Sequence, residues 1–442
     1  MRMLSVLTVL VAAVGVAACG GNDEPRRPDG GKADDPSERP AAGRDLDRDM
    51  LSTRVEANVA ELSGTATITV APSDSRALSL EIGDLTIVSV SDDFGALETN
   101  IGLATLDIGV PATGDPNTVV IEYTYLERDE FEGALDNGIT LTWPYYCGNL
   151  FPCKSDPSDG LELELELTGV PTADTAVYPE AIVADAPAYM LAWAIGDYTY
   201  QSLGTTTAGT EVGVYYLPGE ETIATTGTEN LPALFEWMET TLGPYTFGTR
   251  VASVSAPWGA GAFGGMEHHP LWHVGTAAMG DEETHAHEAA HGWYGNGVRI
   301  ECWEDFVLSE GTVSYLTARS IEVVRGTIAG DAVWEGYRGR LASVADGLAW
   351  PQGCGQIDII DDGLFSSAPY MKGAFFFKSL AAKIGAETLD AILADFYRDH
   401  VGGAAAFQEL LDFVEAETGY DPDSCADSWL RAEALPESEV CP

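Results

Sequence analysis

The most informative stretch of this chain is His287-Glu288-Ala289-Ala290-His291, which indicates a metal site in the fold. Glu310 follows it after eighteen intervening residues. Residues four apart lie on one face of a helix, so both imidazoles can reach one ion. Two imidazoles and one carboxylate are a typical ligand set for catalytic zinc, with a fourth position open for water. Glu288 can hold that water and take its proton. The sequence therefore predicts one Zn²⁺ bound by His287, His291 and Glu310, and the alternative is a surface helix with incidental histidines.

The composition is strongly acidic. The 442 residues include 22 Lys and Arg against 70 Asp and Glu, a formal net charge of -48. A polyanion would be repelled, so nucleic acid is excluded as a partner. The charge indicates solubility in an extracellular or salty setting, with a weak attraction for cationic groups such as peptide N-termini. The length is sufficient for two or three domains.

The N-terminus resembles an export signal. Residues 1–18 carry Arg2 and then an apolar run that is too short for a comfortable membrane span. Val16-Ala17-Ala18-Cys19-Gly20 resembles a bacterial lipobox, in which the cysteine is lipidated and becomes the mature N-terminus. The resemblance implies an exported bacterial lipoprotein, membrane-anchored in the cell envelope through Cys19, or extracellular. The alternative is an ordinary signal peptide with a stray cysteine.

Six cysteines remain beyond Cys19, and an even number in an exported protein predicts three disulfides. Six cysteines allow fifteen connectivities, so the sequence does not fix the pairing. Nearness in the chain favours Cys147 with Cys153 and Cys425 with Cys441, which leaves Cys302 with Cys354.

Composition divides the rest of the chain. Residues 19–48 are rich in Gly, Pro, Asp and Arg and predict a disordered tether. Residues 49–200 predict an antiparallel β domain, a sandwich, from short β-rich segments. Within it, residues 161–167 alternate Leu and Glu, as a strand with one buried face should. The other expected strands are residues 65–70, 85–90, 119–125 and 139–143.

Residues 201–442 predict a mostly helical domain. Leu231, Leu234, Phe235, Met238 and Leu242 recur at helical spacing before Gly243-Pro244. A strand is expected over residues 251–254, and further helices over residues 281–294, 310–325, 372–384, 387–399 and 404–418.

Several motifs, in order, resemble the M1 family of zinc aminopeptidases, gluzincins with a thermolysin-like catalytic domain. The resemblance covers nearly all of the chain beyond the tether. The motifs are Phe151-Pro152-Cys153 with Asp156-Pro157, Ala194-Ile195-Gly196-Asp197-Tyr198, Gly264-Gly265-Met266-Glu267-His268, His291-Gly292-Trp293-Tyr294-Gly295-Asn296, Trp303 to Gly311, and Tyr370-Met371-Lys372-Gly373. The spacing from His291 to Glu310 is also that of the family.

The resemblance assigns roles to single residues. It implies His287, His291 and Glu310 as zinc ligands and Glu288 as general base. Tyr370 matches the tyrosine that donates a hydrogen bond to the oxyanion of the tetrahedral intermediate. Glu267 matches the glutamate that binds the substrate's free α-amine. Gly264, Gly265 and Met266 belong to the same motif, and its glycines match the edge along the substrate backbone.

Three features depart from the family pattern. His268 stands where the family usually has Asn. The family often has a second amine anchor, Gln or Glu, before Phe-Pro-Cys, whereas Leu141 to Tyr146 holds no carboxylate or amide. The chain also ends soon after Ser428-Trp429-Leu430, which resembles the last helix of the catalytic domain. We therefore expect a short form without the large C-terminal helical domain, and a more open cleft.

Six of the seven histidines lie between His268 and His291. His268, His269, His273 and His285 are either a second metal site or, the reading favoured here, outer groups near one zinc. Asp305 is a candidate carboxylate partner for a ligand histidine, because metal-bound histidines usually donate their other N–H to such a group.

Together these features predict a zinc-dependent metallopeptidase that removes N-terminal residues from peptides. Two alternatives stay open. The missing second anchor and an open cleft favour an endopeptidase on the same scaffold. A non-catalytic surface binding protein that retained the fold is the other.

Overall fold

The computed structural model describes residues 39–129, 132–143, 147–259, 264–344, 346–354 and 364–442. Residues 39–442 form one compact unit. The predicted signal peptide and Cys19 lie outside the described residues, as does most of the predicted tether. Within the described ranges, no helix combines the length and apolar character needed to cross a bilayer.

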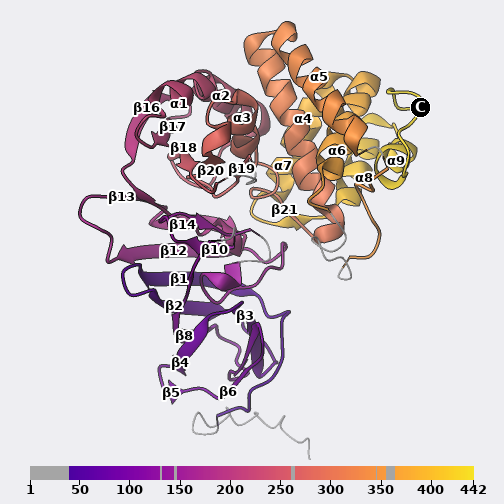
Figure 1. The fold of residues 1–442 in the computed structure, drawn as a ribbon. Helices are drawn as coiled ribbons and strands as arrows, with labels where there is room; N and C mark the ends of the chain where they lie inside the picture. The colour runs from indigo at the N-terminus through magenta and orange to yellow at the C-terminus, as the bar shows by residue number, and fades with distance from the viewer. Residues whose placement is uncertain (1–38, 130–131, 144–146, 260–263, 345, 355–363) are drawn as a thin grey trace, which may run out of the picture. The chain divides into compact units, whose positions relative to one another are not determined.

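The N-terminal part is built from β strands (Figure 1). A sheet of seven strands has the order β14-β12-β1-β2-β8-β4-β5, and a second sheet has the order β3-β7-β6. The strands of the large sheet are β1 (Met50–Asn58), β2 (Ser63–Val70), β4 (Thr86–Asp92), β5 (Gly95–Ala96), β8 (Asn117–Thr124), β12 (Leu161–Thr168) and β14 (Ala181–Ala186). The second sheet holds β3 (Ala77–Glu81), β6 (Thr99–Ile101) and β7 (Thr105–Gly109), and short strands follow as β9 (Glu127–Arg128), β10 (Gly133–Leu135), β11 (Thr140–Leu141), β13 (Thr175–Val177) and β15 (Ala194–Gly196).

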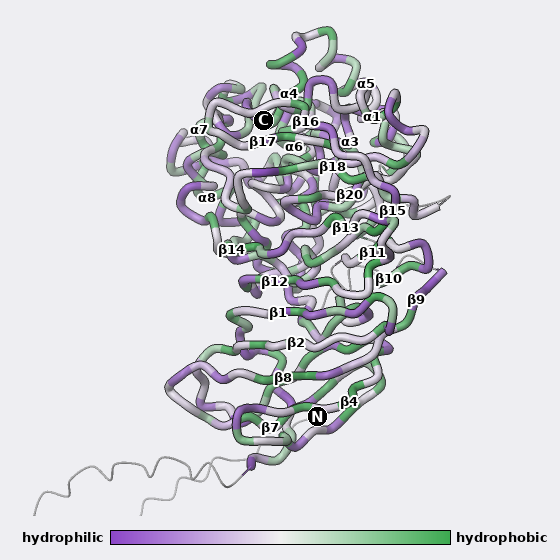
Figure 2. Tube along the Cα trace, turned by 90° about the vertical axis from the view of Figure 1, so that its left-hand side faces the viewer, coloured by the Kyte–Doolittle hydropathy of each residue, from purple (hydrophilic) through white to green (hydrophobic). Residues whose placement is uncertain are grey.

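The two sheets share one apolar core, to which both contribute buried side chains such as Ile68 and Ile121 on one and Leu80 and Ile108 on the other. In β12 the leucines at 161, 163 and 165 are buried while the intervening glutamates are exposed, as the alternation predicts. Figure 2 shows β12, β1, β2 and β8 lying side by side.

The β-rich N-terminal part and the helical part after it confirm the expected fold class. One detail was wrong, because the sheet is not purely antiparallel. β12 pairs parallel to β1, with Val55 opposite Leu165. The long chain segment between these strands provides the crossover that a parallel pair requires.

Residues 39–48, which composition placed in the tether, make contacts with the β sheets. Arg39 forms an ion pair with Asp92 at 2.5 Å. The Arg48 guanidinium is buried and donates to the carbonyls of Ala71 and Ser75. Residues 39–48 therefore pack with the β-rich part, on the N-terminal side of the compositional boundary at residue 48.

The C-terminal part opens with a five-stranded sheet of order β16-β17-β18-β20-β19 and continues as helices (Figure 1). Its strands are β16 (Thr199–Thr205), β17 (Glu211–Tyr216), β18 (Arg250–Ala256), β19 (Gly265–Met266) and β20 (His273–Gly275), with a separate pair of β21 (Arg299–Ile300) and β22 (Ala404–Ala405). The helices are α1 (Glu221–Gly227), α2 (Leu231–Leu242), α3 (Glu282–Ala290), α4 (Phe306–Arg325), α5 (Thr327–Ser343), α6 (Ser367–Ile384), α7 (Ala386–His400), α8 (Phe407–Thr418) and α9 (Asp423–Ala426).

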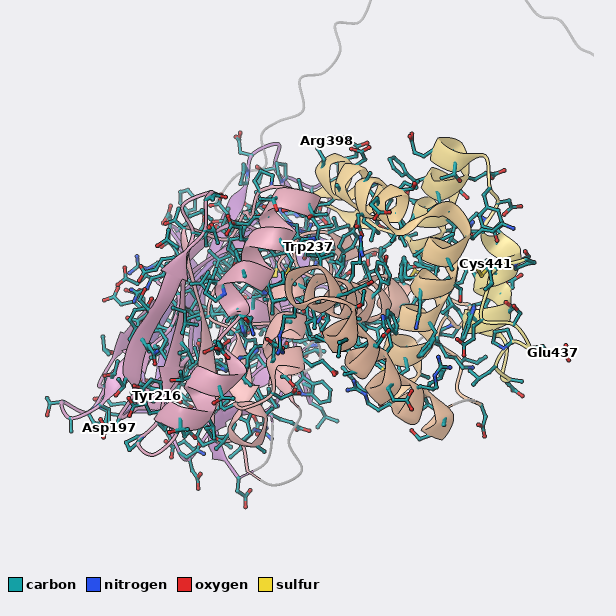
Figure 3. The ribbon with its side chains drawn as sticks, turned by 90° about the horizontal axis from the view of Figure 1, so that it is seen from above. Asp197, Tyr216, Trp237, Arg398, Glu437 and Cys441 are labelled. Atoms are coloured by element: carbon teal, nitrogen blue, oxygen red, sulfur yellow. A yellow bond between two sulfur atoms is a disulfide. The ribbon has the colours of Figure 1, made fainter. Side chains whose placement is uncertain are left out.

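The six expected helices correspond to α2, α3, α4, α6, α7 and α8, with boundary differences of a few residues. Helix α5 was not predicted. The structure also contains the three disulfides that nearness favoured: Cys147–Cys153, Cys302–Cys354 and Cys425–Cys441. The last one ties the chain end at Cys441 to α9 (Figure 3).

Candidate active site

Helix α3 presents the His-Glu-x-x-His stretch, and its start is well specified. The Asp281 side chain caps the helix by accepting from the Glu283 N–H, and Thr284 Oγ1 donates to the same carboxylate. Glu282 and Glu283 add negative charge to the first turn, which suits the positive end of the helix dipole. His291 follows the last helical residue and keeps helical backbone angles, so it lies one turn beyond His287.

Three ligand atoms converge on one point. His287 Nε2 lies 3.1 Å from Glu310 Oε2 and 3.3 Å from His291 Nε2, and His291 Nε2 lies 3.5 Å from Glu310 Oε2. Ligand atoms held about 2.0–2.1 Å from a tetrahedral zinc ion lie roughly 3.3–3.5 Å from one another. His291 Nδ1 is 3.1 Å from the Tyr294 carbonyl, so that nitrogen carries the proton and Nε2 offers a lone pair. The residues fit one zinc ion.

The charges of the site favour a cation. Burial alone would lower the pKa of His291, but the carboxylates of Glu310 and Glu267 outweigh burial and raise that pKa to about 10. Burial would raise the pKa of Glu310, and the two histidines, His291 first, lower it to about 2. The buried acids therefore hold positive charge strongly, as a dication requires.

Glu288 lies against the edge strand β19. Its carboxylate is buried, and burial, reinforced by Glu267 and Glu310, raises its pKa well above the usual value despite the opposing effect of His291. A Cβ added at Gly265 would come within 2.4 Å of Glu288 Oε1. Glycine at this position therefore leaves the space that the carboxylate occupies.

Tyr370 comes from the first turn of α6, and its ring stacks on His287 with centroids 6.0 Å apart. Burial, and next the charge of Glu310, raises the pKa of Tyr370 well above its usual value, so the hydroxyl stays protonated and can donate. Gly311 and Gly373 set its position. A Cβ on Gly373 would lie 2.4 Å from the Gly311 Cα, so these glycines allow α4 and α6, which carry Glu310 and Tyr370, to pack closely.

Glu267 joins the cluster from the turn after β19. One ligand atom from each of Glu267, Glu288 and His291 lies within 4.8 Å of the others. The Tyr189 hydroxyl donates to Glu267 Oε1 at 2.8 Å, and Asn296 Nδ2 donates to the Glu267 carbonyl at 2.7 Å. Tyr189 comes from the β-rich part, and no sequence motif pointed to it.

These groups line a cleft of about 290 Å³. Gly264, Gly265, Met266 and Glu267 form one wall, so the structure brings the whole predicted set to the cleft apart from Asp305. Aromatic side chains that the sequence did not single out also line it, and the Trp143 and Phe365 rings lie 4.1 Å apart.

Asp305 does not bond to a ligand histidine. Its Oδ1 accepts the N–H of Phe407 at 2.9 Å, at the start of α8, and burial raises its pKa to about 6. The backbone carbonyl of Tyr294 instead accepts the hydrogen bond from His291 Nδ1. Asp305 therefore holds α8 against α4.

The other four histidines between residues 268 and 291 are buried and bonded to protein groups: His268, His269, His273 and His285. His269 Nε2 lies 2.8 Å from the Glu288 carbonyl, and His268 Nε2 lies 2.6 Å from the Thr142 carbonyl. Burial lowers the pKa of His268 to about 4 and that of His269 to about 3, so both are neutral. His285 bonds to Ser253 and the Met279 carbonyl. Within the described residues, none of these histidines joins a group of three metal-binding side chains.

Comparison with known proteins identifies this arrangement. Residues 276–429 match the family model described as the peptidase family M1 domain. This region of the chain is therefore similar to the peptidase family M1 domain. It contains His287, Glu288, His291, Glu310 and Tyr370.

Relatives at the sequence level are aminopeptidases. Aminopeptidase M1-B of rice is 24% identical over 71% of this chain and 39% of its own length. Leucine aminopeptidase 2 of Neosartorya fischeri is 24% identical over 65% of this chain and 51% of its own length. The chain thus spans about half or less of the length of these curated relatives.

The fold matches solved structures more completely. An M1 zinc metallopeptidase variant from Deinococcus radiodurans, bound to a Tyr-Ser-Ala substrate, superposes with a TM-score of 0.77 at 17% identity. The match covers 88% of this chain and 95% of that one. The family and this zinc metallopeptidase fold support the expectation of one zinc ion.

Proposed function

We propose that this chain is a zinc-dependent aminopeptidase of the M1 type that removes single residues from the N-terminus of peptides. The observation that carries the proposal is the convergence of three ligand atoms, Glu288 and Glu267 in one cleft. His287, His291 and Glu310 would hold the zinc, which polarises the scissile carbonyl and makes water a stronger nucleophile near neutral pH.

Other groups of the cleft transfer the protons, stabilise the oxyanion and bind the substrate main chain. Glu288 takes the proton from the attacking water and passes it to the leaving amine. The Tyr370 hydroxyl donates to the oxyanion as negative charge develops on the former carbonyl oxygen. The open backbone edge of β19 at Gly264 and Gly265 binds the substrate main chain as an added strand would.

The position of Glu267 favours an exopeptidase. In any residue the amine nitrogen and carbonyl carbon are roughly 2.5 Å apart, because they are separated by two bonds. Glu267 lies within 4.8 Å of Glu288 and His291, so an ammonium bound to it leaves room for one residue before the attacked carbonyl. Tyr189 orients the carboxylate through its hydrogen bond.

A blocked N-terminus tests this proposal. Free peptides should be cleaved one residue at a time, roughly 100-fold or more better than their N-acetylated forms, because acetylation leaves the buried Glu267 charge unpaired. Glu267→Ala should largely abolish the preference. The measurement is kcat/KM for matched free and acetylated peptides, with and without chelator. Efficient internal cleavage of blocked peptides by the wild type would support the endopeptidase alternative.

The same assay tests the non-catalytic alternative, because a binding protein would cleave neither the free nor the acetylated peptides. The side chains that the proposed hydrolysis uses all line the cleft, which favours the catalytic proposal.

We also propose that the chain is exported and anchored to a membrane through a lipid on Cys19, on the strength of the lipobox resemblance. Cys19→Ala should convert a membrane-associated protein into one that is unprocessed or soluble, measured by cell fractionation and N-terminal sequencing. A fully soluble mature wild type beginning at a residue other than Cys19 would contradict this.

A further inference from the structure

Arg340 is the single Arg or Lys among the described residues that line the cleft. The other charged residues there are acidic or are the zinc-site histidines, and the whole chain carries a net charge of -48. A peptide carboxylate that approaches this acidic surface is repelled at long range, so its binding depends on a cationic side chain nearby. Arg340 sits on α5, the helix that was not predicted.

Two contacts hold the Arg340 guanidinium in place. Its Nη2 donates to Glu283 Oε1, and the guanidinium carbon lies over the Tyr337 ring, 4.7 Å from the ring centroid. The Arg340 side chain is 47% exposed. A guanidinium has five N–H donors, so the pair with Glu283 leaves others available to a second carboxylate.

The helix α3 fixes the side of the zinc site on which Arg340 lies. Glu283, His287 and His291 follow one another at intervals of four residues along one face. Glu267 is close to His291, at one end of this row, and Arg340 contacts Glu283 at the other end. A peptide whose amine binds Glu267 therefore runs past the zinc ligands towards Arg340.

The distances suit a short peptide. Glu283 lies roughly 6 Å along the helix axis from His287, at 1.5 Å per residue. Extended chain advances roughly 3.4 Å per residue, so two residues after the scissile bond span about 7 Å. When a tripeptide is cleaved after its first residue, its C-terminal carboxylate lies about this far from the scissile bond. An acidic side chain on the second residue after the bond lies at a similar distance.

Building on the proposed aminopeptidase function, we propose that Arg340 recognises a carboxylate on the leaving side of the substrate. The carboxylate is the C-terminus of a short peptide or an acidic side chain two residues beyond the cleaved bond. Arg340 is a specificity residue, and Glu283 positions its guanidinium.

Three peptides test the proposal: Leu-Gly-Gly, its C-terminal amide, and Leu-Gly-Asp-amide. The wild type should cleave Leu-Gly-Gly about 10-fold better in kcat/KM than its amide. Arg340→Gln should bring that ratio close to one, and Arg340→Lys, which keeps the charge without the planar fork, should retain part of it. Glu283→Gln keeps an oxygen that can accept the positioning hydrogen bond from Arg340 but removes the competing negative charge, so it should raise the ratio.

Arg338→Gln is the matched control, since this neighbouring arginine of α5 pairs with Glu439 and does not line the cleft, and it should keep the wild-type ratio. If the wild type cleaves Leu-Gly-Asp-amide as well as Leu-Gly-Gly, Arg340 accepts a carboxylate of either source. If it cleaves Leu-Gly-Asp-amide no better than the amide of Leu-Gly-Gly, Arg340 recognises only the C-terminal carboxylate. Equal rates for Leu-Gly-Gly and its amide in the wild type, or an unchanged ratio in Arg340→Gln, would overturn the proposal.

Binding separates this inference from the proposed function. Calorimetric affinities of the same peptides for Glu288→Gln should show the carboxylate preference without turnover. A chain that cleaves none of the peptides but keeps this binding preference would refute the aminopeptidase activity alone.

Discussion

Glu288→Gln is expected to retain one zinc ion per chain and to lower turnover by roughly 100- to 10,000-fold, the usual contribution of a positioned general base. The substitution removes the group that accepts the water's proton and leaves His287, His291 and Glu310 unchanged. Glutamine matches glutamate in shape, so it fits the space that Gly265 leaves beside the carboxylate. Metal content by elemental analysis and kcat on a free peptide are the two measurements.

His291→Ala is the matched comparison, because it removes a ligand and should lose metal and activity together. Thermal unfolding of both variants controls for general damage to α3. A metal-replete Glu288→Gln variant with a normal rate would show that another group activates the water.

Tyr370→Phe should lower kcat by roughly 100- to 1,000-fold, as the loss of one oxyanion donor does in other hydrolases. KM should change little, because the hydroxyl acts on charge that develops after binding. The close packing of α4 and α6 at Gly311 and Gly373 holds the ring beside His287, so the phenyl ring should keep the same position.

Tyr337→Phe is a suitable control, since this tyrosine lines the same cleft but its hydroxyl donates to the Ser314 carbonyl. Its kcat should stay near the wild-type value. If Tyr370→Phe keeps full turnover while Tyr337→Phe behaves as expected, oxyanion stabilisation comes from another donor.

Local patterns predicted the elements that carry the chemistry. The alternation of Leu and Glu in β12 and the apolar spacing in α2 specify strand and helix directly, because each depends on neighbours within one element. Helix α5 was not predicted because Gly330, Gly336 and Gly339 lower its helix propensity. Its buried residues Gly330, Trp334, Tyr337 and Leu341 nevertheless form one stripe, which packing against its neighbours stabilises.

The prediction for Asp305 failed for a related reason. The prediction rested on the tendency of metal-bound histidines to donate their other N–H to a carboxylate, but the sequence does not show which way a side chain points. In the structure it faces Phe407, which is 102 residues away, and the Tyr294 carbonyl three residues from His291 takes that role.

The sequence alone determined that His287 and His291 share one helical face with Glu288 beside them, since a helix fixes the geometry of residues one turn apart. It also placed the motif glycines and Glu267 in family order. Only the tertiary structure decided that Tyr189 holds Glu267, that Gly311 meets Gly373, and that Arg340 pairs with Glu283. These contacts join segments more than fifty residues apart, so they depend on how whole elements pack.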